Sequence, residues 1–191
     1  MNGSPPCRAC FGKKFMKKII WTYGLIAGAI VSGLMFASMP FWKNGTLTFD
    51  NGEAVGYTSM VISLSMVFFG VKACRDYHFH GAISFWQAVK VGILITIIAS
   101  VMYALAWEIC YNTIASDFTE KMSEHYVEKI KNETKDEAEI EAAVAQMQSF
   151  KEWYKNPVLR FGITTMEILP VGIVITLVSA ALLRRKEVLP A

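Results

Sequence analysis

Residues 19–39 read IIWTYGLIAGAIVSGLMFASM, a run of 21 residues without a charged side chain. A helix rises about 1.5 Å per residue, so about 20 apolar residues cross the hydrocarbon of a bilayer. Three further apolar runs lie at residues 55–71, 91–107 and 161–183, and of these only the last contains a charged residue, Glu167. The sequence therefore predicts an all-α integral membrane protein whose four spans form a four-helix bundle.

The composition excludes the main alternatives to this prediction. Only 18% of the 191 residues are charged, against about 25% in an ordinary soluble domain. Too little polar surface would remain to cover four such helices in a soluble protein. The first run could be a signal peptide, but it is longer than the usual apolar region of one and lacks a clear cleavage site. A net charge of +3 does not indicate nucleic acid as a partner.

The basic residues predict the orientation. They gather before the first span, between the second and third, and after the fourth: Lys13, Lys14, Lys17, Lys18, Lys72, Arg75, Lys90, Arg184, Arg185 and Lys186. With four spans, these groups all lie on one side of the membrane. Because Lys and Arg in short loops are retained in the cytoplasm, we expect both termini to be cytoplasmic in a cell inner membrane.

Residues 116–156 then lie on the opposite side of the membrane. The segment has more acidic than basic residues, and its apolar residues recur every three or four positions in two stretches. These stripes are Phe118, Met122, Tyr126 and Ile130, and then Ile140, Val144, Met147, Phe150 and Tyr154. We expect an extracytoplasmic amphipathic helical hairpin, which packs on itself, on the membrane surface or on a membrane or periplasmic protein partner. Thr134 and Glu137 have the spacing of a capping box and predict where the second helix starts.

Residues 1–15 are expected to be a flexible or non-native extension, with the four-span domain over residues 16–191. Cys7 and Cys10 have C-x-x-C spacing, but a zinc site needs four ligands, usually from two such groups. The sequence therefore predicts no metal and no cofactor.

Glu167 and Pro170 are the most unusual residues within the spans. A carboxylate within hydrocarbon costs a few kcal/mol, and proline frees a backbone carbonyl one turn earlier in the helix. One interpretation is a proton or cation site; the other is a carboxylate near the interface that bonds to a neighbouring helix. Glu108, after the third span, is expected to be a solvated helix end.

Two further groups are candidates. Lys72, Arg75 and Asp76, with Lys90, are expected to be membrane anchors and a local ion pair, or alternatively a site for a phosphate or lipid headgroup. The second group is a G-x-x-x-G pattern, Gly24 and Gly28 with Ser32 beyond it. Small residues allow helices to approach closely in lipid, so this face is expected to pack on a neighbouring helix, within the chain or in a homo-oligomer.

Two blocks of sequence resemble a known family. They are GVKACRD (70–76) with ISF (83–85) and AVKVGILIT (88–96), and NPVLRFG (156–162) with EILPVG (167–172). They are similar to the bacterial membrane proteins described as domain of unknown function 4199, seen mainly in Bacteroidota, over residues 16–186. The resemblance implies four spans and an inner-membrane location, and it implies no activity.

No nucleotide-binding, metalloprotease or hydrolase motif is present in the sequence. We therefore expect a non-enzymatic accessory or scaffold subunit. The alternative is a small proton- or ion-coupled transporter or channel that uses Glu167. A lipid-modifying enzyme is the weakest hypothesis, because Glu108 and Glu167 would be separated by the bilayer from Lys72 and Arg75.

Overall fold

The computed structural model describes residues 8–79 and 81–184, with side chains from residue 15 onward. All regular secondary structure in this part of the chain is helical, as expected. The six helices are α1 (Arg8–Lys43), α2 (Phe49–Tyr77), α3 (Phe85–Thr113), α4 (Phe118–Glu133), α5 (Glu137–Lys155) and α6 (Pro157–Leu183).

Four of these helices are long and apolar enough to cross a membrane. They are residues Phe15–Lys43 of α1, together with α2, α3 and α6, each of 27 to 29 residues. A helix satisfies its own backbone hydrogen bonds, which is required in hydrocarbon. Each helix continues past the apolar run that predicted it, because its polar ends also favour helix. The chain is a multi-pass membrane protein.

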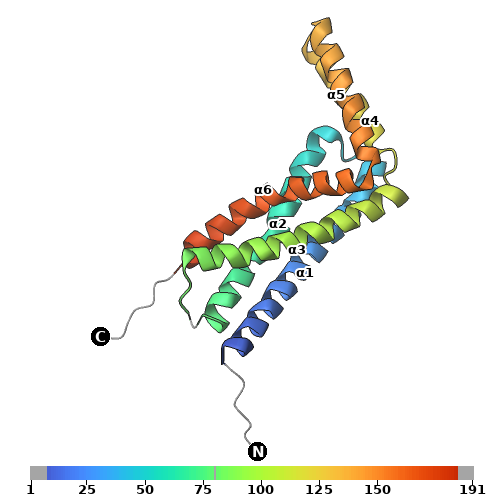
Figure 1. Ribbon diagram of the computed structural model, residues 1–191. Helices are drawn as coiled ribbons and strands as arrows, with labels where there is room; N and C mark the ends of the chain where they lie inside the picture. Colours follow the sequence, from blue (N-terminus) through green and yellow to red (C-terminus); the bar gives the residue numbers. More distant parts are fainter. Residues whose placement is uncertain (1–7, 80, 185–191) are drawn as a thin grey trace, which may run out of the picture.

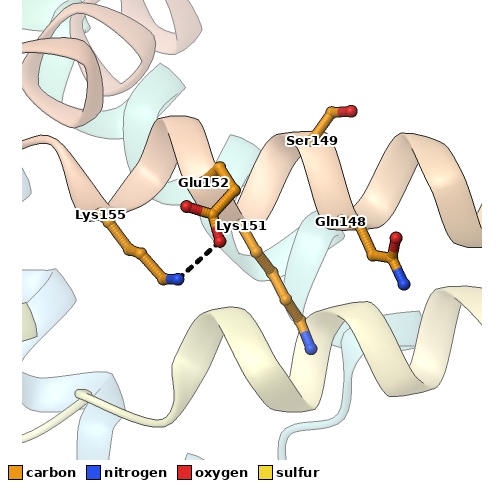
Figure 2. Close-up of a pocket in the computed structure, with 5 residues that line it drawn as sticks. All are labelled: Gln148, Ser149, Lys151, Glu152 and Lys155. Carbon is orange, nitrogen blue, oxygen red and sulfur yellow. Dashed lines mark hydrogen bonds and ion pairs between the residues drawn. The ribbon is translucent and has the colours of Figure 1, made fainter.

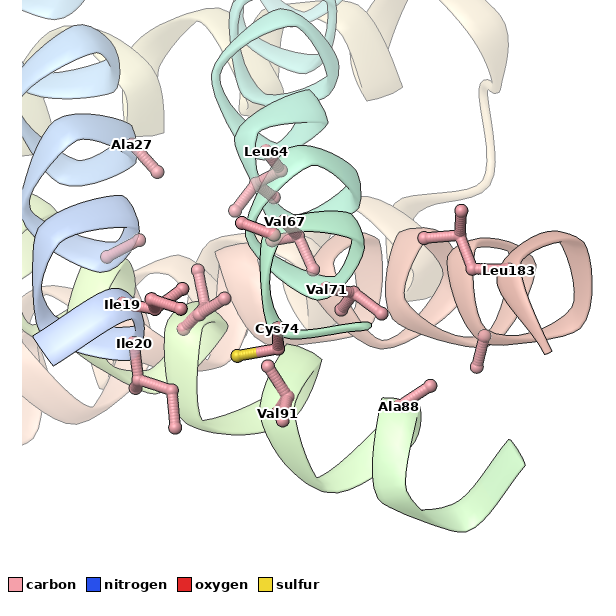
Figure 3. Close-up of a cluster of buried hydrophobic side chains, with 14 of the residues drawn as sticks. Ile19, Ile20, Ala27, Leu64, Val67, Val71, Cys74, Ala88, Val91 and Leu183 are labelled. Atoms are coloured by element: carbon pink, nitrogen blue, oxygen red, sulfur yellow. The ribbon is translucent and has the colours of Figure 1, made fainter. Parts of the chain in front are cut away.

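The four long helices form one bundle, in which α3 packs against α1, α2 and α6, and α2 also packs against α1 and α6. The buried side chains in Figure 3 come from all four helices. Leu64, Val67 and Ile95 are fully buried at the centre of this core. Cys74 and Cys110 are buried free cysteines.

Glycines set the closest approach in the bundle, between α3 and α6. A Cβ atom built on Gly92 would lie 2.6 Å from Cγ2 of Thr176. A Cβ atom on Gly172 would collide in the same way with Thr96, and the hydroxyls of Thr96 and Thr176 lie 3.4 Å apart. Each helix therefore presents a glycine to a threonine of the other, which allows their backbones to come close.

The small residues of α1 face α3. Cβ atoms on Gly24 and Gly28 would lie 2.8 Å and 2.7 Å from the Cβ atoms of Ile98 and Met102. The hydroxyl of Ser32 is buried and has no hydrogen-bond partner among the described residues. This side of α1 packs within the chain.

The hairpin of α4 and α5 rises from one end of the bundle, and the start of α1 and the end of α6 lie at the other end (Figure 1). We call these the hairpin end and the terminal end. The two helices pack on each other. Of the stripe expected on α5, Met147 and Tyr154 are buried, and Ala143, which was not part of that stripe, is buried with them. On α4 the buried residues are Thr119 and Ser123, one position beyond the expected stripe.

The start of α5 differs slightly from the capping prediction. Asp136 is the N-cap and accepts a hydrogen bond from the backbone N–H of Ala138 at 3.0 Å. Thr134 instead ends α4. At the N-terminus, α1 begins at Arg8, so residues 8–15 are helical; residues 1–7, including Cys7, lie outside the described residues.

Candidate functional site

A buried ion pair joins α3 to α6 at the hairpin end. Asn156 caps α6 by accepting from the backbone N–H of Val158 at 2.9 Å, and Arg160 follows in the first turn. The Arg160 side chain is only 5% exposed. Its Nε and Nη2 atoms donate to the two carboxylate oxygens of Glu108, at 2.8 Å and 2.5 Å. Such a bidentate pair fixes both position and orientation.

Arg160 also holds the base of the hairpin. Its Nη1 donates to the backbone carbonyl of Tyr154, the second-last residue of α5, at 3.1 Å. Its Cζ atom lies 4.1 Å from the centre of the Tyr111 ring, a distance typical of a cation–π contact. One guanidinium therefore contacts α3, α5 and α6 at once.

Trp107 adds a second connection between α3 and α5. Its indole Nε1 donates to the hydroxyl of Tyr154 at 2.7 Å. Burial raises the pKa of the Tyr154 hydroxyl to about 12, although this hydrogen bond acts in the opposite direction. We call Trp107, Glu108, Tyr111, Tyr154 and Arg160 the clamp.

Aromatic rings connect α4 to the first two spans. Phe118, at the start of α4, has its ring centre 5.6 Å from that of Phe49 and 6.3 Å from that of Trp42. Two turns farther along α4, Nε2 of His125 lies 3.3 Å from a carboxylate oxygen of Asp50. The hairpin is thus attached on two sides, through α5 at the clamp and through α4 at these rings.

Glu167 has a different environment from Glu108. Its side chain is exposed on α6, ten residues after Pro157, in the apolar part of the span. No hydrogen bond or ion pair to its carboxylate occurs among the described residues. Pro170 is also exposed, and α6 continues through it without a break.

A comparison with family models finds a match. The model described as "Protein of unknown function (DUF4199)" matches residues 22–185. The chain belongs to this family. The match includes α2 to α6 and most of α1, so the clamp and Glu167 both lie within the DUF4199 region. Comparisons with curated proteins and with solved structures each gave no match.

The remaining charged candidates of this DUF4199 protein lie at the terminal end. Lys72, Arg75 and Asp76 are in the last two turns of α2, and Lys90 is in the second turn of α3. Nε of Arg75 lies 2.7 Å from the Asp76 carboxylate, while Lys72 and Lys90 are exposed. The bundle thus separates this group from Glu167 and the clamp. No group of three metal-ligating side chains occurs in the part of the chain that the structure describes.

The sequence did not predict the clamp. Glu108 was expected to be solvated, but it is paired with Arg160, so that expectation was wrong. The two residues are 52 positions apart, which no local periodicity can connect. A signal was available: Glu108 and Arg160 are opposite charges at the ends of two spans that the predicted topology places on one side of the membrane.

Proposed function

We propose that this protein is a non-enzymatic accessory or scaffold subunit in a membrane and that it presents the hairpin to a partner protein. The clamp is the observation that supports this proposal. A buried arginine with three hydrogen-bonded contacts and an aromatic ring holds α5 in a defined orientation on α3 and α6. A segment that merely connected two spans would need no such attachment.

The distribution of charged residues supports one orientation of the protein in the membrane. Segment 116–156 has ten acidic and six basic residues, whereas Lys17, Lys18, Lys72 and Lys90 lie at the terminal end. Because basic residues are retained in the cytoplasm, the proposal places the termini in the cytoplasm of a bacterial cell and the hairpin outside its inner membrane.

The partner would meet a mainly polar surface, because α4 and α5 pack on each other and Ala143 and Met147 of α5 are buried. Figure 2 shows one part of the α5 surface, where Glu152 forms an ion pair with Lys155 at 2.6 Å. Gln148, Ser149 and Lys151 line the same shallow hollow. These side chains all come from one helix, so the hollow is a contact surface and not an enclosed binding pocket.

Site-specific photo-crosslinking in intact cells tests this function. A photoreactive residue is placed at exposed positions along the hairpin, such as Glu139, Gln148 and Glu152. We expect one discrete adduct that forms from positions on a single face of the hairpin, since a docked partner covers one face. Ala143, which is buried between the two helices, is the control position and should give no adduct.

The clamp gives a second control for the same experiment. Glu108→Gln should weaken the adduct without lowering the amount of protein in the membrane, because the hairpin loses its fixed orientation. If every exposed position gives only diffuse products, or if the adduct is the same in the Glu108→Gln variant, the scaffold function is wrong.

Glu167 favours a second candidate function, that of a small proton- or ion-coupled transporter or channel. The observation is an exposed carboxylate, without a hydrogen-bond partner among the described residues, within an apolar span. Proton and cation flux into vesicles that contain purified protein should then fall strongly in Glu167→Gln. Equal flux in the two proteins, or none in either, would reject this function.

A further inference from the structure

Glu167 lies in the half of α6 nearest the hairpin end, and on α2 only Gly52 and Met60 are buried before Ser63. The buried stripe of α2 includes Met60, Ser63 and Leu64. Continued toward the hairpin end at helical spacing, this stripe reaches Gly56 and Glu53. Glu53 is exposed, and a Cβ atom added to Gly56 would meet nothing within 4 Å. The inward side of α2 is therefore open at Gly56, whereas Gly52, one turn earlier, packs against Trp42 of α1 and the stripe from Met60 onward is buried.

The same region contains two hydrogen-bond acceptors on α6. The first is the Glu167 carboxylate, which has no partner among the described residues. The second is the backbone carbonyl of Met166, because Pro170 has no N–H to donate to the residue four positions earlier. Met166 and Pro170 are both exposed. In lipid, acceptors without donors are unfavourable, so this face favours a ligand that provides donors and positive charge.

The position of Glu167 along its span limits which protein could provide the positive charge. Glu167 follows Arg160 by seven residues, roughly 10 Å along a helix axis, so it lies below the level of the clamp. In the described spans, lysine and arginine occur only near the helix ends, and Arg160 is already paired with Glu108. A second copy of this chain would therefore bring another carboxylate to this depth, but no cation.

We propose that the face formed by Glu53, Gly56, Met166, Glu167 and Pro170 receives a membrane-spanning helix of a different protein. That helix has a lysine or arginine at the depth of Glu167. The cation pairs with the Glu167 carboxylate and donates to the Met166 carbonyl, and Gly56 lets the helix come close to α2. The inference rests on the proposed accessory role and names the class of its partner.

Synthetic transmembrane helices test the proposal directly. Donor-labelled full-length protein is reconstituted in phosphatidylcholine vesicles with acceptor-labelled peptides of about 20 apolar residues. One peptide has a single lysine seven residues from one end of its apolar stretch, and a matched peptide has leucine there. Energy transfer should show association about tenfold tighter for the lysine peptide, the order expected of a polar contact between helices in lipid.

Substitutions then locate the contact. Glu167→Gln, which keeps the size of the side chain, should reduce binding of the lysine peptide to that of the leucine peptide. Glu120→Gln, an exposed residue of α4, is the matched control and should leave the difference intact. Gly56→Leu should weaken both peptides, because it fills the space beside α2. Circular dichroism confirms that each variant is folded.

Three results would overturn the proposal. The first is equal binding of the lysine and leucine peptides. The second is an unchanged preference for lysine in Glu167→Gln. The third is energy transfer between differently labelled copies of the protein that disappears in Glu167→Gln, which would make a second copy the occupant. The peptides do not use the hairpin, so a failure here is distinct from a failure of the crosslinking experiment.

Discussion

Among the residues of the clamp, Arg160 depends most on its neighbours, because its charge is buried. It is a buried cation whose charge is balanced by one carboxylate, that of Glu108. Removing one member of a buried pair leaves the other charge uncompensated, whereas replacing both with apolar residues is often tolerated. Two predictions at this scale follow from the clamp.

The first prediction concerns the pair itself. Glu108→Leu should lower the free energy of unfolding by about 3 kcal/mol, because the Arg160 charge stays buried without its partner. The double variant Glu108→Leu with Arg160→Met should lose clearly less than this. Denaturant titration in detergent micelles, followed by circular dichroism, measures both. The single variant Arg160→Met is measured in the same way. If the double variant loses as much stability as the two single variants lose when added together, Glu108 and Arg160 do not stabilise the protein as a pair.

The second prediction concerns pH. Burial raises the pKa of Tyr154 to about 12 in the folded protein, above the value of about 10 for an unperturbed tyrosine. The neutral hydroxyl is therefore favoured by folding. This contribution, on the order of 2 kcal/mol, is complete below pH ~10 and is lost as the pH rises to ~12. The Tyr154→Phe variant should show a smaller loss of stability over this range in pH-dependent melting; an identical curve would contradict the assignment.

Among the elements, α3 and α6 show how small residues determine packing. Gly172→Ala should lower the free energy of unfolding by about 1–3 kcal/mol, because the added methyl group must displace Thr96 or separate the helices. Gly162 lies in the same helix, and a Cβ atom there would meet nothing within 4 Å. Gly162→Ala is thus the matched control and should leave the thermal midpoint unchanged or raised. Equal losses in the two variants would mean that helix propensity, and not the contact with Thr96, explains the effect.

The helices also show how much of the fold could be predicted from the sequence. The four spans and the two hairpin helices follow from local properties, namely length, hydropathy and periodicity, and all six are present. The buried face of α4 was misplaced by one position, since Thr119 and Ser123 are buried and Tyr126 is 37% exposed. Periodicity shows that a helix has an apolar side, but the neighbouring helix decides which residues are covered.

The candidate sites were less predictable, for a related reason. Glu167 is conspicuous in the sequence because charge is rare within a span, and its exposure on α6 could not be read from that pattern. The clamp depends on residues from α3, α5 and α6 that meet only in the folded chain. The charged candidates at the terminal end could be recognised as a group in the sequence, because Lys72, Arg75 and Asp76 are close together.

For the whole molecule, we predict which side of the membrane each connecting segment lies on. Reporter fusions at residue 125, in the hairpin, and at residue 186, after α6, should report opposite sides of the membrane, because α6 lies between them. A fusion after residue 80, between α2 and α3, should agree with the fusion at residue 186. The same side for residues 125 and 186 would contradict the four-span arrangement.

The long hairpin on its narrow base has a mechanical consequence. The 19 residues of α5 form a helix roughly 28 Å long. A rotation of about 10° where α5 meets Arg160 would sweep the far tip through roughly 5 Å by that same geometry. Any rotation at the base is therefore amplified at the tip, because the tip is the part of the hairpin farthest from the clamp.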